Sequence, residues 1–437
     1  MIGRNVIMGI KEERNLRTEW MMQDRFGMFL HWGLYAIPAR GEWVRNQERI
    51  SNEAYEKYFK TFNPTDYDPK KWAALAKKAG MKYAVLTTKH HDGFCLFDSA
   101  LTDYKATNTP AKRDLVREYV DAFRAEGIKI GFYYSLLDWH HPDYPAYGDR
   151  IHPMRENEAY KNQNGEQFER YVDYFHGQVK ELLTNYGKID ILWFDFSYDT
   201  MTGEKWQATK LINMVRNLQP DIIIDNRLGG DIRSENPELY SGDFASPEQT
   251  IPAEGMTDSI GDPLPWEACI TLNYNWGYTV ADHDYKTPKD VVHALVECVS
   301  KKGNLLLNVG PDAKGNIPKE SIDILSKVGD WMELNAKSIY GCTASGYSKP
   351  EWGRLTQNGN KLYAHIFERS MVTLALNNIA ETVTDARLVR DDSEVKISVP
   401  WYATHYGEGK NVYITLNGHA LPDELDTVVE LTLEDET

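Results

Sequence analysis

The stretch 188–198, KIDILWFDFSY, indicates the fold class of this chain. Its mostly apolar run from Ile189 to Phe196 has the length of a fully buried strand. Asp190 lies at the start of the run, and a second carboxylate, Asp195, interrupts it near its far end. Burying a carboxylate costs free energy unless the group is hydrogen-bonded, paired or used in a site. Arg227 ends the next apolar run along the chain, so Asp195 is either its structural ion-pair partner or part of a functional site.

Six more apolar runs occur between residues 25 and 335, and stretches with helical spacing separate them. Several of these stretches end in Gly, a common helix stop. This alternation predicts a (β/α)8-like barrel, an α/β fold that takes about 250 residues plus insertions. A doubly wound open sheet is the alternative, although no G-x-G-x-x-G follows the early strands. The predicted strands are FGMFLHWG (26–33), YAVLTTKH (83–90), IKIGFYYS (128–135), IDILWFD (189–195), DIIIDNR (221–227), ACITLNYN (268–275) and NLLLNVGP (304–311).

After residue 340 the sequence changes to short alternating runs separated by turn residues such as Asn358-Gly359 and Asn417-Gly418. This pattern predicts a small antiparallel β-sandwich. We therefore expect a catalytic barrel over residues 1–340 and a β-sandwich domain over residues 345–437. The predicted strands are KLYAHIF (361–367), MVTLAL (371–376), DARLVR (385–390), EVKISV (394–399), NVYITL (411–416) and TVVELTL (427–433).

The composition limits the partners and the compartment of this protein. Its 65 acidic and 49 basic residues give a formal charge of -16, which argues against nucleic acid as a partner. The four cysteines form no C-x-x-C pair, so we expect free, mostly buried thiols. No run of 18 apolar residues predicts a membrane span, and the first twenty residues show no signal-peptide pattern. We expect a cytoplasmic protein as the chain stands, or a periplasmic or secreted one if a signal peptide has been removed.

Polar side chains collect at the carboxyl ends of the predicted strands. In a (β/α)8 barrel these ends meet on one face, and that face carries the active site. Any one of these residues could instead be an ordinary hydrogen-bonded structural residue, but their convergence predicts a site. The residues are His31, His90, His91, Tyr134, Asp195, Arg227 and Asn275.

Glycoside hydrolysis is one chemistry that this face could support, because it requires two carboxylates. The loop SGDFASPEQTIP (241–252) offers Asp243 and Glu248 as partners for Asp195. A metal-dependent hydrolase is the alternative, since KHHDGF (89–94) and DWHHPDYP (138–145) place four histidines near carboxylates. Adjacent strand residues point to opposite faces, so His90 and His91 should not both bind one ion.

Eight motifs in order resemble the α-L-fucosidases of glycoside hydrolase family 29, over residues 25 to 340. The later β-rich segment is similar in texture to the C-terminal β-sandwich of that family. The motifs are RFGMFLHWGLYAIPARGEW (25–43), KHHDGFCLFDS (89–99), GFYYSLLDW (131–139), ILWFDF (191–196), DNR (225–227), GDFASPE (242–248), PWEACITLNYNWGY (265–278) and GNLLLNVGPDAKG (303–315).

The resemblance implies a role for each matching residue. Asp195 would be the catalytic nucleophile and Glu248 the general acid/base, with Glu238 and Glu254 as alternatives in the same stretch. No metal ion and no cofactor would be needed. The residues implied to bind fucose are His31, Glu42, Trp43, His90, His91, Tyr134, Trp193, Arg227 and Trp276.

The implied activity is retaining, exo-acting hydrolysis of terminal α-L-fucosyl residues on oligosaccharides or glycoconjugates. The stretch SPEQTIPAEG (246–255) resembles relatives that prefer α-1,3 and α-1,4 linkages. A fucose-binding lectin that keeps the pocket without the chemistry is the alternative, and the presence of both carboxylates argues against it. The sequence does not indicate an oligomeric state.

Overall fold

Seven parallel strands form the central sheet of the computed structural model, which describes residues 9–161, 163–369, 374–380, 382–418 and 420–434. Their order across the sheet is β5-β4-β3-β2-β1-β7-β6, which is the cyclic order of a barrel. A doubly wound sheet would instead reverse its order at a switch point. All seven predicted strands are confirmed. They are β1 (Phe26–Leu30), β2 (Tyr83–Lys89), β3 (Lys129–Ser135), β4 (Ile191–Asp195), β5 (Ile223–Ile224), β6 (Glu267–Thr271) and β7 (Asn304–Val309).

The predicted number of eight barrel strands is not confirmed, because the described residues form seven regular parallel strands. An irregular extended segment, residues 243–249, lies between the edge strands β5 and β6. Phe244 forms a parallel bridge with Asp225, which follows β5, and Glu248 forms one with Cys269 of β6. Asp243 N donates to Ile224 O at 2.6 Å, so this segment is hydrogen-bonded to both edges of the curled sheet.

The two faces of the curled sheet bury different sets of side chains. An inner cluster takes side chains from all seven strands, among them Tyr83, Tyr133 and Trp193. An outer cluster takes alternate residues of the same strands, such as Ala84 and Tyr134, and packs them against helices. Because successive strand residues point to opposite faces, position along a strand decides whether a side chain reaches the interior.

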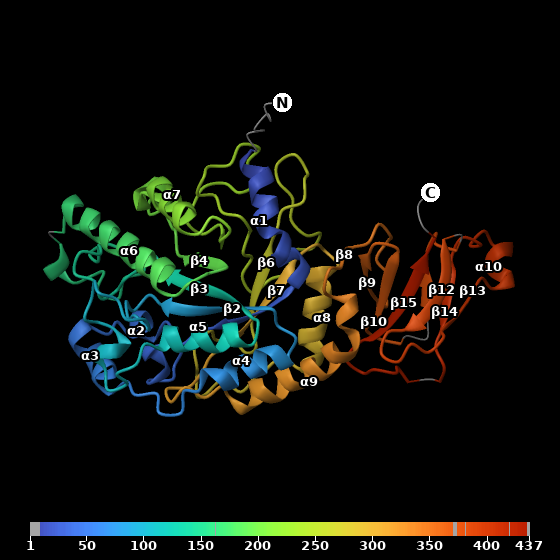
Figure 1. Cartoon of the computed structure of the whole chain (residues 1–437), viewed down its shortest axis with the longest axis horizontal. Coiled ribbons are helices and arrows are strands. Elements are labelled where there is room, and N and C mark those ends of the chain that lie inside the picture. Colours follow the sequence, from blue (N-terminus) through green and yellow to red (C-terminus); the bar gives the residue numbers. More distant parts are fainter. Residues whose placement is uncertain (1–8, 162, 370–373, 381, 419, 435–437) are drawn as a thin grey trace.

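Helices cover the outer face of the sheet (Figure 1). Helices form in the stretches between strands that show helical spacing, and side-chain caps mark several starts, including capping boxes at Asn164 and Thr287. The longer helices around the sheet are α1 (Ile10–Asp24), α3 (Asn52–Thr61), α4 (Pro69–Lys78), α5 (Leu115–Ala125), α6 (Gly165–Asn185), α7 (Ala208–Leu218), α8 (Pro288–Val299) and α9 (Lys319–Asn335). Short ones are α2 (Val44–Gln47) and the 3-10 turns η1 (Leu34–Ala36), η2 (Ala106–Asn108), η3 (Glu158–Tyr160), η4 (Gly203–Trp206) and η5 (Ala336–Ser338).

Two antiparallel sheets follow the parallel one, as the alternating sequence predicts. Their orders are β12-β15-β10-β9-β8 and β11-β14-β13, and side chains of both sheets share one apolar cluster, as in a sandwich. Asn358 and Lys361 pair across the predicted Asn-Gly turn. Part of the predicted strand 371–376 lies outside the described residues. The elements are β8 (Thr343–Ala344), β9 (Gly353–Asn358), β10 (Lys361–Ile366), β11 (Leu374–Leu376), β12 (Val383–Leu388), β13 (Lys396–Ser398), α10 (Trp401–His405), β14 (Val412–Thr415) and β15 (Thr427–Leu433).

Helices α8 and α9 join the parallel sheet to the antiparallel ones (Figure 1). The ring of His293 on α8 stacks on Phe367 with centroids 3.6 Å apart, and Trp331 Nε1 on α9 donates to Asp426 O at 2.9 Å. The division into domains at residues 340–345 stays a prediction. Across the described part of the chain, we find no helix with the length and apolarity to cross a membrane.

Candidate active site

A pocket opens at the carboxyl ends of the parallel strands, as the sequence predicts. It brings together both predicted carboxylates and all but one of the residues that the resemblance implies for fucose binding. Its lining residues are Phe29, His31, Glu42, Trp43, His90, His91, Tyr133, Trp193, Asp195, Phe196, Arg227, Glu248, Cys269 and Trp276.

Asp195 lies at the end of β4 with its carboxylate directed into the pocket. Tyr133 Oη donates to Asp195 Oδ2 at 2.7 Å, and Arg227 Nη1 donates to Asp195 Oδ1 at 2.9 Å. Burial and the neighbouring carboxylate raise the pKa of Tyr133 far above its usual value, so this phenol stays a proton-bearing donor. Asp195 is therefore both ion-paired and hydrogen-bonded in a site that a substrate can reach.

Glu248 belongs to the segment 243–249 and faces the same pocket. Its Oε2 lies 2.9 Å from Arg227 Nη2, so one guanidinium binds both carboxylates. The Glu248 side chain is 44% exposed, whereas that of Asp195 is 11% exposed. Asp195 is therefore the more buried of the two carboxylates, and Glu248 has the wider contact with solvent.

Arg227 is fixed by more than the two carboxylates. Its Nε donates to Ser246 Oγ at 3.1 Å, and its guanidinium lies 4.5 Å from the centre of the Trp193 ring. Burial alone would lower the pKa of Arg227, but the charges of Asp195 and Glu248 raise it above its usual value. A permanently charged, clamped guanidinium therefore sets the relative position of the two carboxylates.

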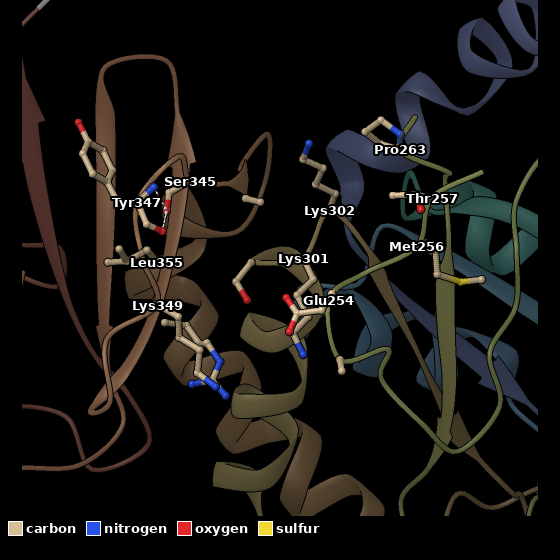
Figure 2. Close-up of a pocket in the computed structure, with 14 residues that line it drawn as sticks. Glu254, Met256, Thr257, Pro263, Lys301, Lys302, Ser345, Tyr347, Lys349 and Leu355 are labelled. Carbon is tan, nitrogen blue, oxygen red and sulfur yellow. Dashed lines mark hydrogen bonds between the residues drawn. The ribbon is translucent and has the colours of Figure 1, made fainter. Parts of the chain in front are cut away.

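The other candidate carboxylates lie outside this pocket. Glu238 accepts hydrogen bonds from Ser241 Oγ at 2.8 Å and from Asp231 N at 3.2 Å. Glu254 lines a different cavity, between the parallel sheet and the antiparallel ones (Figure 2). Asp243 is buried and paired with Arg17 and Arg216, so it anchors the segment that carries Glu248.

Three buried histidines, His31, His90 and His91, line one side of the pocket. Burial lowers the pKa of His31 and of His91 to about 3, and the pKa of His90 far below its usual value, so all three are neutral near pH 7. His31 Nδ1 lies 2.7 Å from Asn308 Oδ1, and His91 Nδ1 lies 2.7 Å from Ser135 Oγ. Neutral imidazoles held in this way can bind hydroxyl groups without adding charge to the site.

The expectation that His90 and His91 point to opposite faces is wrong. Strand β2 ends at Lys89, so the alternation of a strand does not apply to these two residues. Both rings line the pocket, with centroids 4.0 Å apart. In the part of the chain that the structure describes, no group of three or more His, Cys, Asp or Glu side chains could hold a metal ion.

Glu42 and the tryptophans complete the wall of the pocket. Glu42 Oε2 accepts a hydrogen bond from Gly277 N at 2.8 Å, and burial raises the pKa of this carboxyl. This bond ties the loop after β1 to Trp276, whose ring lies 5.0 Å from that of His31. The ring of Trp43 lies 5.1 Å from that of His91.

The structure corrects the placement of Tyr134. This residue faces away from the pocket, and its hydroxyl donates to Gln178 Oε1 on α6 at 2.7 Å. Tyr133 occupies the interior instead, because it pairs in register with Trp193 of β4 and so shares the inward direction of Trp193 and Asp195. The sequence shows that Trp193 and Asp195 point to the same face of their strand. It does not show the register between β3 and β4, which decides whether Tyr133 or Tyr134 shares that face.

Asn275 also lies outside the pocket lining, and its Nδ2 donates to Asp282 Oδ2 at 2.7 Å. Conversely, Phe29, Phe196 and Cys269 line the pocket and were not predicted to do so. Phe29 is an ordinary interior strand residue and Phe196 follows Asp195 directly. Neither carries a sequence signal that separates it from the apolar core.

Two carboxylates bridged by one arginine at the carboxyl end of a barrel-like parallel sheet are the groups that glycoside hydrolysis requires. The family model described as Alpha-L-fucosidase matches residues 10–337. The chain therefore belongs to the α-L-fucosidase family, as its motifs indicate.

Solved structures and curated sequences agree with this assignment. The chain is 65% identical to α-L-fucosidase isoenzyme 1 from Paenibacillus thiaminolyticus, with a TM-score of 0.95 over 97% of this chain and 100% of that one. It is 30% identical to a family 29 α-L-fucosidase from Bacteroides thetaiotaomicron solved as a trapped covalent intermediate, with a TM-score of 0.84 over 96% of each chain. A curated α-L-fucosidase from Dictyostelium discoideum is 27% identical over 91% of this chain and 88% of its own length.

Proposed function

We propose that this protein removes terminal α-L-fucosyl residues from fucosylated oligosaccharides or glycoconjugates, with Asp195 as nucleophile and Glu248 as general acid/base. The observation that carries these roles is the Arg227 guanidinium, which binds both carboxylates at 2.9 Å. Retaining glycosidases need their two carboxyl groups close together, and a shared arginine brings them close. The trapped covalent intermediate of the Bacteroides thetaiotaomicron relative supports the same mechanism.

In the first step Asp195 attacks the anomeric carbon while Glu248 protonates the departing glycosidic oxygen. A covalent fucosyl–Asp195 ester forms and the aglycone leaves. In the second step Glu248 takes a proton from water, whose oxygen attacks the same carbon and frees Asp195. Tyr133 and Arg227 donate hydrogen bonds to Asp195 in the free enzyme, and they stabilise the carboxylate again when the ester breaks.

The remaining pocket residues would hold the fucosyl ring. Neutral His31, His90 and His91 would exchange hydrogen bonds with its hydroxyl groups, and Glu42 would accept from one of them. Trp276 would pack against the apolar side of the ring near its methyl group. Tyr133 takes the place proposed from sequence for Tyr134.

The variants Asp195→Asn and Glu248→Ala test the two roles, with fucosyl fluoride and an activated aryl α-L-fucoside as substrates. Asp195→Asn should lose turnover by more than about 10³-fold with its fold intact, as expected for loss of a nucleophile. Glu248→Ala should keep the first step on these good leaving groups. Added azide should then speed its turnover and give fucosyl azide of retained α configuration.

Variants of the two alternative carboxylates, Glu238 and Glu254, are the matched controls for the acid/base role. Glu238→Ala and Glu254→Ala should keep wild-type turnover, because neither residue lines the pocket. Near-wild-type turnover of Asp195→Asn would remove that residue from the mechanism, and azide rescue in a Glu238 or Glu254 variant would move the acid/base role there. A protein that binds fucose without any turnover would be the lectin, and activity that EDTA abolishes would favour the metal-dependent alternative.

For the linkage we propose α-1,3 and α-1,4, from the resemblance of the stretch 246–255 to relatives with that preference. A panel of α-1,2, α-1,3, α-1,4 and α-1,6 fucosylated oligosaccharides tests this directly, with free fucose as the readout. We expect the highest kcat/KM for α-1,3 and α-1,4 linkages. Preferred release from the α-1,2 or the α-1,6 linkage would overturn the proposal.

A further inference from the structure

The loop after β6, residues 272–286, carries an exposed aromatic ring beside the catalytic pocket. Tyr274 is 77% exposed, although the chain enters the pocket only two residues later at Trp276. Exposed tyrosines are common singly, so exposure alone indicates nothing. Here a hydrogen bond holds the backbone that carries the ring, and hydrogen bonds through Thr271 connect this loop to the segment that carries Glu248.

The Asp282 side chain of the same loop holds the backbone at Tyr274. The Tyr274 backbone N–H donates to Asp282 Oδ2 at 2.9 Å, and Asn275 Nδ2 donates to the same oxygen at 2.7 Å. The base of the loop is closed by Lys286 N, which donates to Leu272 O at 2.7 Å. The backbone that carries the ring is therefore held in place, which lowers the conformational cost of binding there.

The loop also lies on the side of Glu248. Glu248 pairs in parallel with Cys269 of β6, and Gln249 Nε2 donates to Thr271 Oγ1 at 3.0 Å. Thr271 Oγ1 in turn donates to Asn273 O at 2.5 Å, directly before Tyr274. Glu248 lies beside Cys269 of β6, and Tyr274 follows the carboxyl end of the same strand. In the proposed mechanism Glu248 lies on the aglycone side of the bond, and the loop of Tyr274 is hydrogen-bonded to the segment that carries Glu248.

Around the ring the surface forms a wide and open depression. Asp282, His283 and Asp284 line it together with Tyr274 and Asn275. An aromatic face with hydrogen-bonding groups at its rim suits a pyranose, whose C–H face packs on a ring while its hydroxyl groups find polar partners. Two carboxylates disfavour an anionic sugar at this place.

We propose that Tyr274, with Asp282 and Asp284, forms a binding site for the neutral sugar to which the fucose is attached. The inference rests on the proposed function and deepens it, because it assigns the aglycone rather than the fucose to a named surface. Tyr274 is a specificity-determining residue. It takes no part in the bond-breaking steps at Asp195 and Glu248.

Two substrates separate this role from catalysis. A neutral fucosylated oligosaccharide fills both sites, whereas α-L-fucosyl fluoride has no aglycone sugar. Tyr274→Ala should lower kcat/KM for the oligosaccharide about fivefold to tenfold, mainly through KM, and change that for the fluoride less than about twofold. Tyr274→Phe should retain most of the oligosaccharide activity, since the ring remains. Leu16→Ala on α1, another exposed side chain, is the control and should change neither value.

Equal losses on both substrates in Tyr274→Ala, or no loss on either, would overturn the inference. Hydrolysis of the oligosaccharide should also fall when its aglycone carries a sialic acid, and equal rates for both forms would contradict the assignment to a neutral sugar. If the wild-type protein fails to hydrolyse fucosyl fluoride, the proposed function itself is wrong. The failure of the inference and the failure of the function therefore give different results.

Discussion

At the scale of single residues, the contrast between Tyr133 and Tyr134 is directly testable. Tyr133→Phe removes a hydrogen bond to the Asp195 carboxylate, and such charged bonds contribute about 1.5–3 kcal/mol. We expect kcat on fucosyl fluoride to fall roughly 10- to 100-fold with an unchanged circular dichroism spectrum. Tyr134→Phe removes only the bond to Gln178, so it should keep kcat and lose about 1 kcal/mol of unfolding free energy. A larger kcat loss in Tyr134→Phe would restore the placement predicted from sequence.

A sequence identifies some residues of the site but cannot decide between Tyr133 and Tyr134. Charged residues at strand ends, such as Asp195 and Arg227, stand out because burial without a partner is costly. Two adjacent tyrosines are equally compatible with a core and a pocket, and only the register between β3 and β4 decides which one faces inward. His90 and His91 depend on a different detail, the residue at which β2 ends, and a sequence does not locate a strand end to within one residue.

At the scale of elements, the segment 243–249 should depend on the side chain of Gln249. Its amide donates to Thr271 Oγ1 at 3.0 Å and accepts from Thr271 N at 3.3 Å, which holds the segment against β6. Gln249→Ala removes these bonds, so the Glu248 carboxylate should no longer be held within hydrogen-bonding distance of the leaving group. We expect about a tenfold loss of kcat on an oligosaccharide, whose leaving group needs a proton, and a small loss on fucosyl fluoride. Equal losses on both substrates would instead indicate a general disturbance of the pocket.

Strands and helices can be predicted from the sequence where their buried residues form an apolar run or recur at a regular spacing. All seven parallel strands appear in the sequence as apolar runs. Segment 243–249 has no such pattern, because Gly242 precedes it, Pro247 lies within it and its first residue, Asp243, is a buried acid. Arg17 and Arg216 neutralise that acid, and only the folded chain brings them there. Helix α1 has no apolar stripe to mark it in the sequence, because ion pairs of Arg17 and Lys11 provide much of its anchoring.

At the scale of the whole molecule, a charge cluster on α8 links the parallel sheet to the antiparallel ones. Glu297 Oε1 lies 2.5 Å from Lys301 Nζ, and its other oxygen binds Arg354 of β9. Burial alone would raise the pKa of Glu297, but hydrogen bonds from the two cations lower it below 4.5. The cluster therefore stabilises the folded state fully above pH 4.5 and loses this contribution as the pH falls below that value.

Glu297→Ala would leave Lys301 and Arg354 without this partner at the cavity of Figure 2, which both residues line. We expect a loss of about 2 kcal/mol and a decrease in Tm of roughly 4 °C at pH 7, with the difference from wild type shrinking below pH 4.5. Asp330→Ala is the matched control, because its pair with Lys78 on the outside is more than half exposed and should contribute under about 0.5 kcal/mol. Both variants should keep wild-type kcat, since neither residue lines the catalytic pocket. If Glu297→Ala instead lowered kcat at unchanged Tm, the antiparallel sheets would act on catalysis, and a purely stabilising role for this junction would be excluded.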